Sequence, residues 1–191
     1  MSATLYASST PTAEKTLWRT PPALVAAVVA RFGPLHVDAS ASPGMAIGGV
    51  LAQITPAADA LAPRSWASYS PIRRPAIWLN PPWAGGGITK QWAARALTEV
   101  DRGCSRLFVL VPEATDSAWW WTLAARSLVV YSLGRVGYMR PGGEIAARPG
   151  HGSSLFYLLP GGSAEAQAAL VPWRDWQTAA PARPRFSVVR S

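Results

Sequence analysis

The stretch Ala76-Ile77-Trp78-Leu79-Asn80-Pro81-Pro82-Trp83 decides the fold that we expect for this chain. Its four leading apolar residues are typical of a central strand that is buried on both faces of an α/β sheet. Two prolines then end the strand, because neither has an N–H to donate to a neighbouring strand. Residues before a proline favour extended backbone, so we expect a stiff loop. In open α/β sheets, ligands bind at this carboxyl end of the strands.

The four residues Asn80, Pro81, Pro82 and Trp83 suit the activation of an amine on a purine or pyrimidine ring. Such an amine is a poor nucleophile because its lone pair is delocalised into the ring. The Asn80 side-chain oxygen and the Pro81 carbonyl can each accept one of its hydrogens, which exposes the lone pair. Trp83 offers a face on which a base can stack, a contact worth about 1–3 kcal/mol. A structural loop with a packed tryptophan fits the same residues, so the motif alone leaves both interpretations open.

The sequence after this loop predicts a βαβ unit. A helix with an apolar face is expected from Ile88 to about Asp101, and Leu107–Pro112 is expected to form a second buried strand. In this order the two strands should be parallel and the crossover right-handed. Further strands are predicted at three places, namely Leu35–Asp38, Leu128–Tyr131 and Ser154–Leu159.

Two more helices are predicted from their end signals. Thr20 fits an N-cap and Pro21 a first helical residue, and Gly33 fits the end of the same helix. Thr115 or Asp116 is expected to cap the next helix, which carries tryptophans at positions 119 to 121. Three adjacent side chains cannot all face one side of a helix. At least one tryptophan should therefore face solvent, DNA or a protein partner, and a homodimer is one interpretation.

Composition is consistent with one soluble domain and a polyanionic partner. The chain has 191 residues, of which 49% are hydrophobic, and its formal net charge is +8. A basic balance of this kind fits nucleic acid, although a GC-rich coding sequence also enriches arginine. The one cysteine, Cys104, excludes an intrachain disulfide, and no metal site is predicted. We find no signal peptide or membrane span and expect a cytoplasmic protein. Residues 1–15 are expected to form a flexible arm, 16–178 one domain and 179–191 a basic disordered tail.

Asp38 is placed at the carboxyl end of a predicted strand and is followed by the small-residue turn Ala39-Ser40-Ala41-Ser42-Pro43-Gly44. A nucleoside-binding α/β domain has its first loop at such a position. Asp38 could equally be a carboxylate that only stabilises the turn.

Basic residues occur in two segments that could contact nucleic acid. Arg73 and Arg74 precede the central strand, where a solvated loop is an equally good interpretation. The segment from Gly134 to Gly152 is rich in glycine and basic residues and contains Tyr138, which favours a contact with the nucleic-acid backbone. A disordered surface loop is the alternative. Three arginines of this segment are candidate contacts, namely Arg135, Arg140 and Arg148.

Taken in order, these segments resemble the phage-type DNA N6-adenine methyltransferases, the small Dam-like family, over roughly Leu17 to Leu159. The matching segments have the spacing of that family, and they are Trp18-Arg19-Thr20-Pro21-Pro22, Val37-Asp38-Ala39-Ser40-Ala41-Ser42, Asp59-Ala60-Leu61 with Trp66, Asn80-Pro81-Pro82-Trp83, Leu110–Asp116 with Trp119, and Leu133-Gly134-Arg135-Val136.

The resemblance implies an α/β, Rossmann-like, S-adenosyl-L-methionine-dependent fold with a mostly parallel central sheet flanked by helices. It implies an adenine-specific enzyme of phage or prophage origin that flips its target base out of DNA. The catalytic residues would be Asn80, Pro81, Pro82 and Trp83. Asp59 would hold the adenine amine of the cofactor, and the implied cofactor contacts as a set are Trp18, Thr20, Pro21, Asp38, Ala39, Asp59, Ala60 and Asn80.

The chain departs from the family pattern at three points. Trp83 replaces the commoner tyrosine, Ala60 replaces a glycine, and no acidic residue lies between Asp38 and Asp59 to bind the cofactor ribose. Two alternatives therefore stay open. The acceptor could be another planar amine, such as cytosine N4, RNA adenine or a protein glutamine. The chain could also be a DNA-binding module on a methyltransferase fold that has lost its activity.

Overall fold

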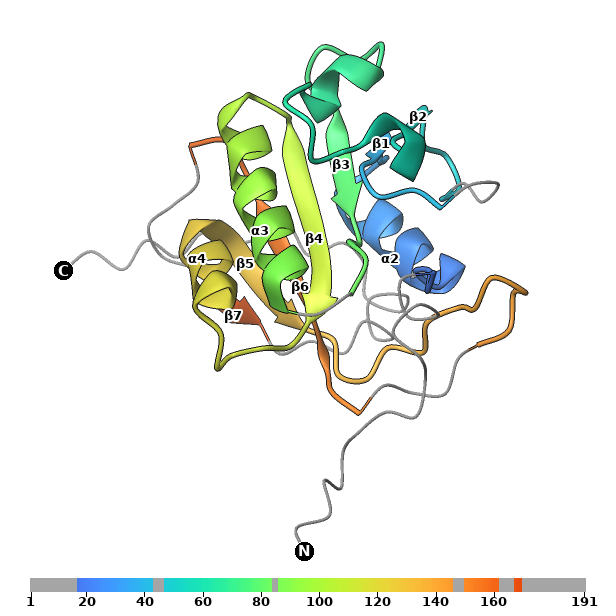
Figure 1. The fold of residues 1–191 in the computed structure, drawn as a ribbon, viewed down its shortest axis with the longest axis vertical. Helices are drawn as coiled ribbons and strands as arrows, with labels where there is room; N and C mark the ends of the chain where they lie inside the picture. The colour runs from blue at the N-terminus through green and yellow to red at the C-terminus, as the bar shows by residue number, and fades with distance from the viewer. Residues whose placement is uncertain (1–16, 43–46, 84–85, 146–149, 162–166, 170–191) are drawn as a thin grey trace, which may run out of the picture.

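The computed structural model describes residues 17–42, 47–83, 86–145, 150–161 and 167–169 (Figure 1). The predicted arm at 1–15 and tail at 179–191 lie outside these residues, and so does Arg148. The elements in chain order are α2 (Pro22–Phe32), β1 (Val37–Asp38), β2 (Ala52–Gln53), the short 3-10 helices η1 (Pro56–Ala58) and η2 (Trp66–Tyr69), β3 (Ala76–Leu79), α3 (Gly86–Asp101), β4 (Arg106–Pro112), α4 (Ala118–Arg126), β5 (Ser127–Ser132), β6 (Ser153–Leu158) and β7 (Gln167–Ala169).

The described strands form one mixed sheet in the order β2-β1-β3-β4-β6-β5-β7. The pairs β1–β2, β1–β3, β3–β4 and β5–β7 are parallel, so the predicted parallel βαβ unit of β3, α3 and β4 is confirmed. β6 is antiparallel to both of its neighbours, β4 and β5. The expectation of a mostly parallel sheet is therefore met only in part.

The reversal of β6 follows from its connection to β5. A parallel neighbour needs a crossover that returns the chain to the opposite edge of the sheet, usually through a helix. No helix occurs in the described part of residues 133–152. The chain leaves β5 and enters β6 at the same edge, so β6 must run in the opposite direction. In Figure 1 this connection is the orange loop at the bottom of the molecule.

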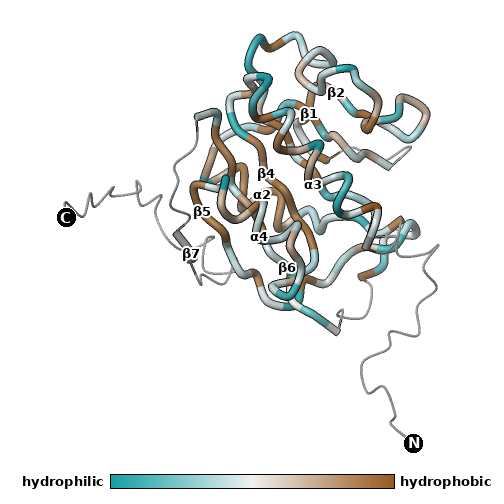
Figure 2. The backbone as a smooth tube through the Cα atoms, turned by 60° about the vertical axis from the view of Figure 1, so that its left-hand side comes forward, coloured by the Kyte–Doolittle hydropathy of each residue, from teal (hydrophilic) through white to brown (hydrophobic). Residues whose placement is uncertain are grey.

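The core consists of two clusters, one on each face of the sheet. Alternate residues of β3 serve different faces: Ile77 and Leu79 belong to the cluster that includes α3 and α4, while Ala76 and Trp78 pack with α2. Every residue of β3 is fully buried. The prediction of a central strand buried on both faces is confirmed, and Figure 2 shows the hydrophobic residues concentrated along the strands.

Several predicted boundaries need correction. Pro21 is the N-cap of α2 and Pro22 its first residue, and the Thr20 side chain makes no capping hydrogen bond. Ser117 rather than Thr115 or Asp116 precedes α4, again without a side-chain cap. These errors arise because propensity alone does not fix a helix end to better than one or two residues.

Other end signals of the sequence agree with the structure. Gly33 ends α2 with a positive φ of 88°, and its N–H donates to the Val29 carbonyl at 2.8 Å. Of the three adjacent tryptophans, Trp120 is buried and Trp121 is 58% exposed, as the sequence required. The homodimer remains a prediction. None of the helices within the described ranges could cross a lipid bilayer.

A buried acid on α3 fixes the loop that precedes β3. The Glu99 side chain is fully buried and forms ion pairs with Arg95 and Arg102, both at 2.9 Å. Its other oxygen accepts hydrogen bonds from the Ser65 hydroxyl at 2.9 Å and the Trp66 N–H at 2.7 Å. Because four donors surround one carboxylate, α3 and the loop from residue 63 to 66 are held together.

Replacing Glu99 should therefore destabilise the protein strongly. We expect Glu99→Ala to lower the free energy of unfolding by about 3–5 kcal/mol, because it removes the carboxylate that pairs with the largely buried Arg95 and leaves the Ser65 hydroxyl and the Trp66 N–H without their acceptor. The matched control is Asp101→Ala, which removes the exposed acid of the Arg126 ion pair and should cost less than about 1 kcal/mol. Urea unfolding measures both. Equal losses would show that the buried Glu99 contributes no more to the free energy of unfolding than the exposed Asp101 does.

Candidate active site

A cavity of about 790 Å³ lies over the carboxyl ends of β1, β2 and β3 and is closed on one side by α2. This volume is within the range of small-molecule sites, about 300–1,000 Å³. Its wall includes a polar residue at the carboxyl end of each strand: Asp38 is the last residue of β1, Thr55 lies two residues after β2, and Asn80 directly follows β3. The position agrees with the ligand edge that the sequence predicted from the end of the central strand.

Asp38 brings an acidic group into the cavity wall. Its side chain is only 4% exposed, and one carboxylate oxygen accepts a hydrogen bond from the Ser40 N–H at 3.1 Å. Burial raises the pKa of Asp38 to about 6, and the Ser40 N–H opposes that rise. A buried carboxylate with one internal donor is suited to a cationic partner, because a nearby positive charge favours its ionised form.

Ser40 connects the loop after β1 to the loop after β3. Its hydroxyl donates to the Asn80 carbonyl at 2.8 Å and accepts from the Asn80 N–H at 3.0 Å. Both backbone groups of Asn80 are therefore satisfied by one side chain. Sequence reasoning included Ser40 in the first loop but gave it no role, because the contact joins residues that are 40 positions apart.

The Asn80 side-chain oxygen is a buried acceptor with unused hydrogen-bonding capacity among the described residues. It is buried in the cavity wall and has no hydrogen-bond partner among the described residues. A buried polar atom without a partner costs about 1–3 kcal/mol, so such atoms need an explanation. An acceptor held in this way can receive a hydrogen bond from an amine that enters the cavity.

The cavity is bounded near the β2 edge by the segment around Asp59. Asp59 has a positive φ of 44°, and its carboxylate accepts the Leu61 N–H at 3.1 Å. The buried Trp66 indole donates to the Ala60 carbonyl at 2.7 Å. Asp59 and Ala60 both line the cavity. Within the segment that the sequence groups with Trp66, Ala60 is therefore in direct contact with that tryptophan.

Trp18 forms part of the cavity wall and belongs to a cluster of aromatic rings behind it. Trp18 lines the cavity and stacks on the buried Tyr138, with ring centroids 6.3 Å apart. Trp83 meets Tyr138 edge to face at 4.5 Å and contacts the His151 ring at 5.8 Å. The sequence predicts that Tyr138 belongs to a segment that contacts nucleic acid. It is instead fully buried, and its hydroxyl pairs with Ser153 at 2.9 Å.

Most of the predicted site residues share this cavity. Of the predicted cofactor and catalytic residues, the wall includes Trp18, Thr20, Asp38, Asp59, Ala60, Asn80 and Pro82, whereas Pro21, Ala39, Pro81 and Trp83 are outside it. Sequence analysis missed several wall residues, among them Thr55, Ile54, Ile88 and Trp92. Thr55 follows a two-residue strand that is too short to recognise, and Ile88 and Trp92 look like ordinary core positions of a helix.

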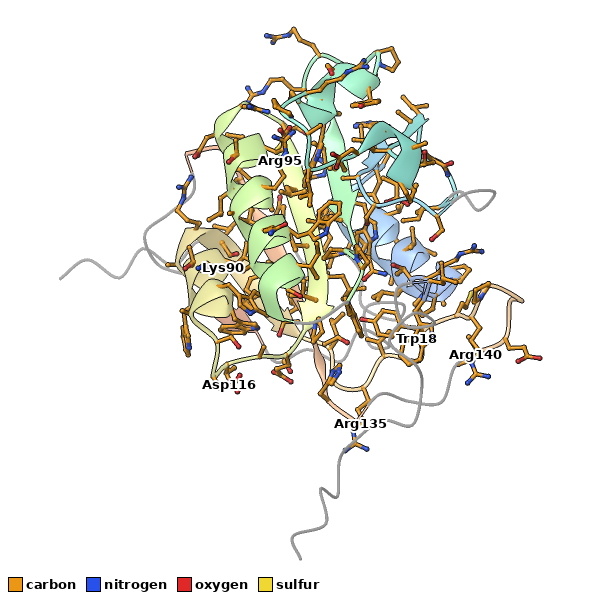
Figure 3. All side chains as sticks on the ribbon, viewed as in Figure 1. Trp18, Lys90, Arg95, Asp116, Arg135 and Arg140 are labelled. Atoms are coloured by element: carbon orange, nitrogen blue, oxygen red, sulfur yellow. The ribbon has the colours of Figure 1, made fainter. Side chains whose placement is uncertain are left out.

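The candidate nucleic-acid arginines lie at opposite ends of the strands. Arg73 and Arg74 are exposed ahead of β3, and the four residues of that strand alone separate them from Asn80 by about 13 Å. Arg135 is exposed and Arg140 half-buried in the segment after β5. Figure 3 shows Arg135 and Arg140 at the same end of the molecule as Trp18. Of the two pairs, only Arg135 and Arg140 lie at the end of the sheet that carries the cavity.

The described residues include no group of three His, Cys, Asp or Glu side chains that could hold a metal ion. The wall offers acidic, amide and aromatic groups, which together suit an organic ligand with an aromatic ring and positive charge.

A ligand-sized cavity over the strand ends, with acids and a proline-stiffened amide loop in its wall, is the arrangement of a small-molecule site in an α/β protein. The sequence matches the model of the DNA N-6-adenine-methyltransferase (Dam) family over residues 7–159, and the chain belongs to this family. The resemblance predicted from the sequence motifs is confirmed. A search of curated proteins found no match.

Loss of the Ser40 hydroxyl should loosen the Asn80 loop. We expect Ser40→Ala to lower the free energy of unfolding by about 1–3 kcal/mol, because two backbone groups of Asn80 lose their partner. Hydrogen exchange at the Asn80 amide should accelerate at the same time. Ser42→Ala, in the same loop, keeps both contacts and is the control. Unchanged exchange at Asn80 in Ser40→Ala would refute this role for the hydroxyl.

Asp38 should make the ligand-free protein less stable at neutral and alkaline pH. Because its pKa is raised from 3.8 to about 6 in the folded state, stability falls as pH rises between these values and the loss persists above them. Asp38→Asn should therefore be more stable than the unsubstituted protein at pH 8, by at most about 3 kcal/mol. The difference should vanish below pH 4.

Denaturant unfolding at several pH values, without added ligand, measures this difference. The exposed acid Asp116 is the control, and Asp116→Asn should show no gain at pH 8. A destabilised Asp38→Asn at pH 8 would mean that a positive charge within the protein already stabilises the carboxylate.

Proposed function

We propose that this chain transfers a methyl group from S-adenosyl-L-methionine to the N6 amine of adenine in DNA. The observation that carries the proposal is the buried, unpartnered Asn80 oxygen in the wall of a ligand-sized cavity. Membership of the DNA N-6-adenine-methyltransferase family supports the reaction and the DNA substrate. We also infer that the mixed sheet is a Rossmann-like variant, because β1, β3 and β4 are parallel and the cavity lies at the carboxyl ends of β1, β2 and β3.

The residues of the cavity fit the cofactor. Two carboxylates, Asp38 and Asp59, occur in the wall, and the cofactor has a cationic ammonium and a cationic sulfonium. Thr55, after β2, offers a hydroxyl where the sequence has no acid for the ribose. Asp59 would bind the adenine amine of the cofactor, and Asp38 the positively charged end. When bound, the cofactor supplies the electrophilic methyl group.

The chain's own residues would orient and activate the acceptor amine. The flipped adenine would donate one N6 hydrogen to the Asn80 oxygen and the other to the Pro81 carbonyl, which localises the lone pair on nitrogen. Ser40 fixes the Asn80 backbone, so the amide is held in place before the base arrives. Such preorganisation accounts for much of the rate enhancement in reactions of this kind.

Trp83 and the arginines after β5 would receive the DNA. Trp83 is half-buried beside the Asn80 loop, and we assign its ring to stacking on the flipped base. Arg135 and Arg140 lie at the cavity edge of the sheet and would contact the phosphate backbone. Arg73 and Arg74 precede β3, at the opposite end of that strand from Asn80, and their contact with nucleic acid stays a prediction.

The decisive variant is Asn80→Ala. We expect it to fold normally and to lose at least about hundredfold in transfer rate, because a preorganised hydrogen-bonding group is removed. The measurement is incubation with cofactor and DNA, digestion to nucleosides and identification of the methylated base by mass spectrometry. Gln91→Ala, which removes an exposed amide on α3, is the control and should retain full activity.

The same assay separates the alternatives. N4-methylcytosine, or a product only from RNA or from protein glutamine, would change the acceptor but keep the enzyme. Retained turnover in Asn80→Ala would refute the proposed activation of the amine. An absence of cofactor binding at millimolar concentration would leave a DNA-binding module as the better description.

A further inference from the structure

The acidic residues of the described chain are concentrated at one end of the sheet. Those that line the cavity or lie in the loops at the same end are Asp38, Asp59, Glu113, Asp116 and Glu144. The other two acids within the described ranges, Glu99 and Asp101, are at the opposite end, and both form ion pairs with arginines. Composition does not place charges in space, so a GC-rich coding sequence does not account for this division.

Three exposed arginines lie at the end that is poor in acids. Arg64, Arg73 and Arg74 belong to the loop before β3, and none of them forms an ion pair with a described residue. We call these three residues the far-end arginines. The same loop, from residue 62 to 74, has three serines and neither Asp nor Glu. Figure 1 shows this loop at the top of the molecule, at the opposite end from the orange loop that follows β5.

The loop that carries the far-end arginines is fixed at both of its ends. The Arg102 guanidinium donates to the Pro63 carbonyl at 2.8 Å, and the Ser105 N–H donates to the Pro75 carbonyl at 2.9 Å. Arg95 donates to a further carbonyl of the loop, and Figure 3 shows Arg95 toward the opposite end of the molecule from Arg135 and Arg140. A loop held in this way loses little conformational entropy when it binds a partner.

Arg64 is itself held in place on this loop. Its Nε atom donates to the Ser68 hydroxyl at 3.0 Å, and its guanidinium lies over the Tyr69 ring, 4.1 Å from the centroid. Its two terminal nitrogens make no hydrogen bond to any residue that the structure describes. A guanidinium with these two nitrogens available can make paired hydrogen bonds to the oxygens of a phosphate group.

The composition of this surface favours DNA over a protein partner. Protein interfaces have a hydrophobic centre, whereas Ile72 is the one large hydrophobic residue of the loop that is strongly exposed. Arginine and serine side chains without neighbouring acids are typical of surfaces that contact a nucleic-acid backbone. The chain belongs to a family of DNA methyltransferases, so DNA is the polyanion that the family membership indicates.

A straight duplex that meets the Asn80 end of the sheet does not also meet the opposite end. Duplex DNA is stiff, with a persistence length of about 50 nm, so bending it round one small domain is costly. We propose that the far-end arginines bind the phosphate backbone of a second segment of duplex DNA. This inference goes beyond the proposed function and does not assume methyl transfer. A chain with two such surfaces can pass from one DNA segment to another without leaving DNA.

The test is the number of short duplexes that each full-length chain binds. A duplex of about 12 base pairs is about 40 Å long and too stiff to wrap round the protein. Calorimetry at low salt, without cofactor, should give two duplexes per chain for the unsubstituted protein. The triple variant Arg64→Gln, Arg73→Gln, Arg74→Gln should bind one. Counting per chain excludes an effect of dimerisation, because a dimer with one duplex on each protomer also gives one per chain.

A matched variant isolates the far-end surface. Arg135→Gln combined with Arg140→Gln should weaken the other duplex and leave the far-end duplex bound. In that background, adding Arg73→Gln should reduce the slope of log affinity against log salt by about 1, because one phosphate contact is lost.

Two controls separate the loss of charge from a change in structure. Replacing all three far-end arginines by lysine keeps their charge and should retain two duplexes per chain. The thermal midpoint of the triple glutamine variant should match that of the unsubstituted protein, because none of the three arginines is in an ion pair with a described residue.

The outcomes distinguish this inference from the proposed function. One duplex per chain in the unsubstituted protein, or two in the triple glutamine variant, would overturn the second DNA surface while methyl transfer could still be observed. Tighter binding of duplex RNA than of duplex DNA at this surface would overturn the choice of partner. Two duplexes per chain without any methylated product would support the surface and overturn the proposed function.

Discussion

The architecture of the site depends on one side chain, the hydroxyl of Ser40, which both donates to and accepts from the backbone of Asn80. β1 and β3 are adjacent parallel strands, so their carboxyl ends meet at one edge of the sheet. Two prolines prevent the chain after β3 from pairing with a neighbouring strand. Without another partner, the Asn80 peptide groups would need water. Ser40 provides a fixed contact in place of that water and holds the Asn80 backbone.

The cavity keeps two groups in states that reduce the stability of the ligand-free protein. Asp38 is a buried carboxylate with one internal donor, and the Asn80 oxygen lacks a partner among the described residues. Residues that bind a polar ligand must have unsatisfied hydrogen-bonding capacity before it arrives, and functional sites often reduce stability for this reason. The rest of the fold compensates through a core packed on both faces of the sheet and through the Glu99 cluster on α3.

Part of the fold could be predicted from the sequence because the signals are local. The apolar run of β3, the two prolines and Gly33 each act on their own backbone, and the structure agrees with them. The direction of β6 could have been predicted from the absence of a helical pattern between residues 133 and 152. The helix caps could not, because Pro21 and Pro22 are both compatible with a first turn.

For the candidate site, the sequence by itself determined which residue types occur and in what order. It identified Asn80, Asp38 and Asp59 as polar groups that follow strands or turns, and those three side chains do line one cavity. Tertiary structure alone decided the rest: Ser40 meets Asn80 across 40 residues, Tyr138 is buried between Trp18 and Trp83, and Arg19 is held at the wall by Met139. The physical reason is that these contacts join segments far apart in the chain, so no local pattern specifies them.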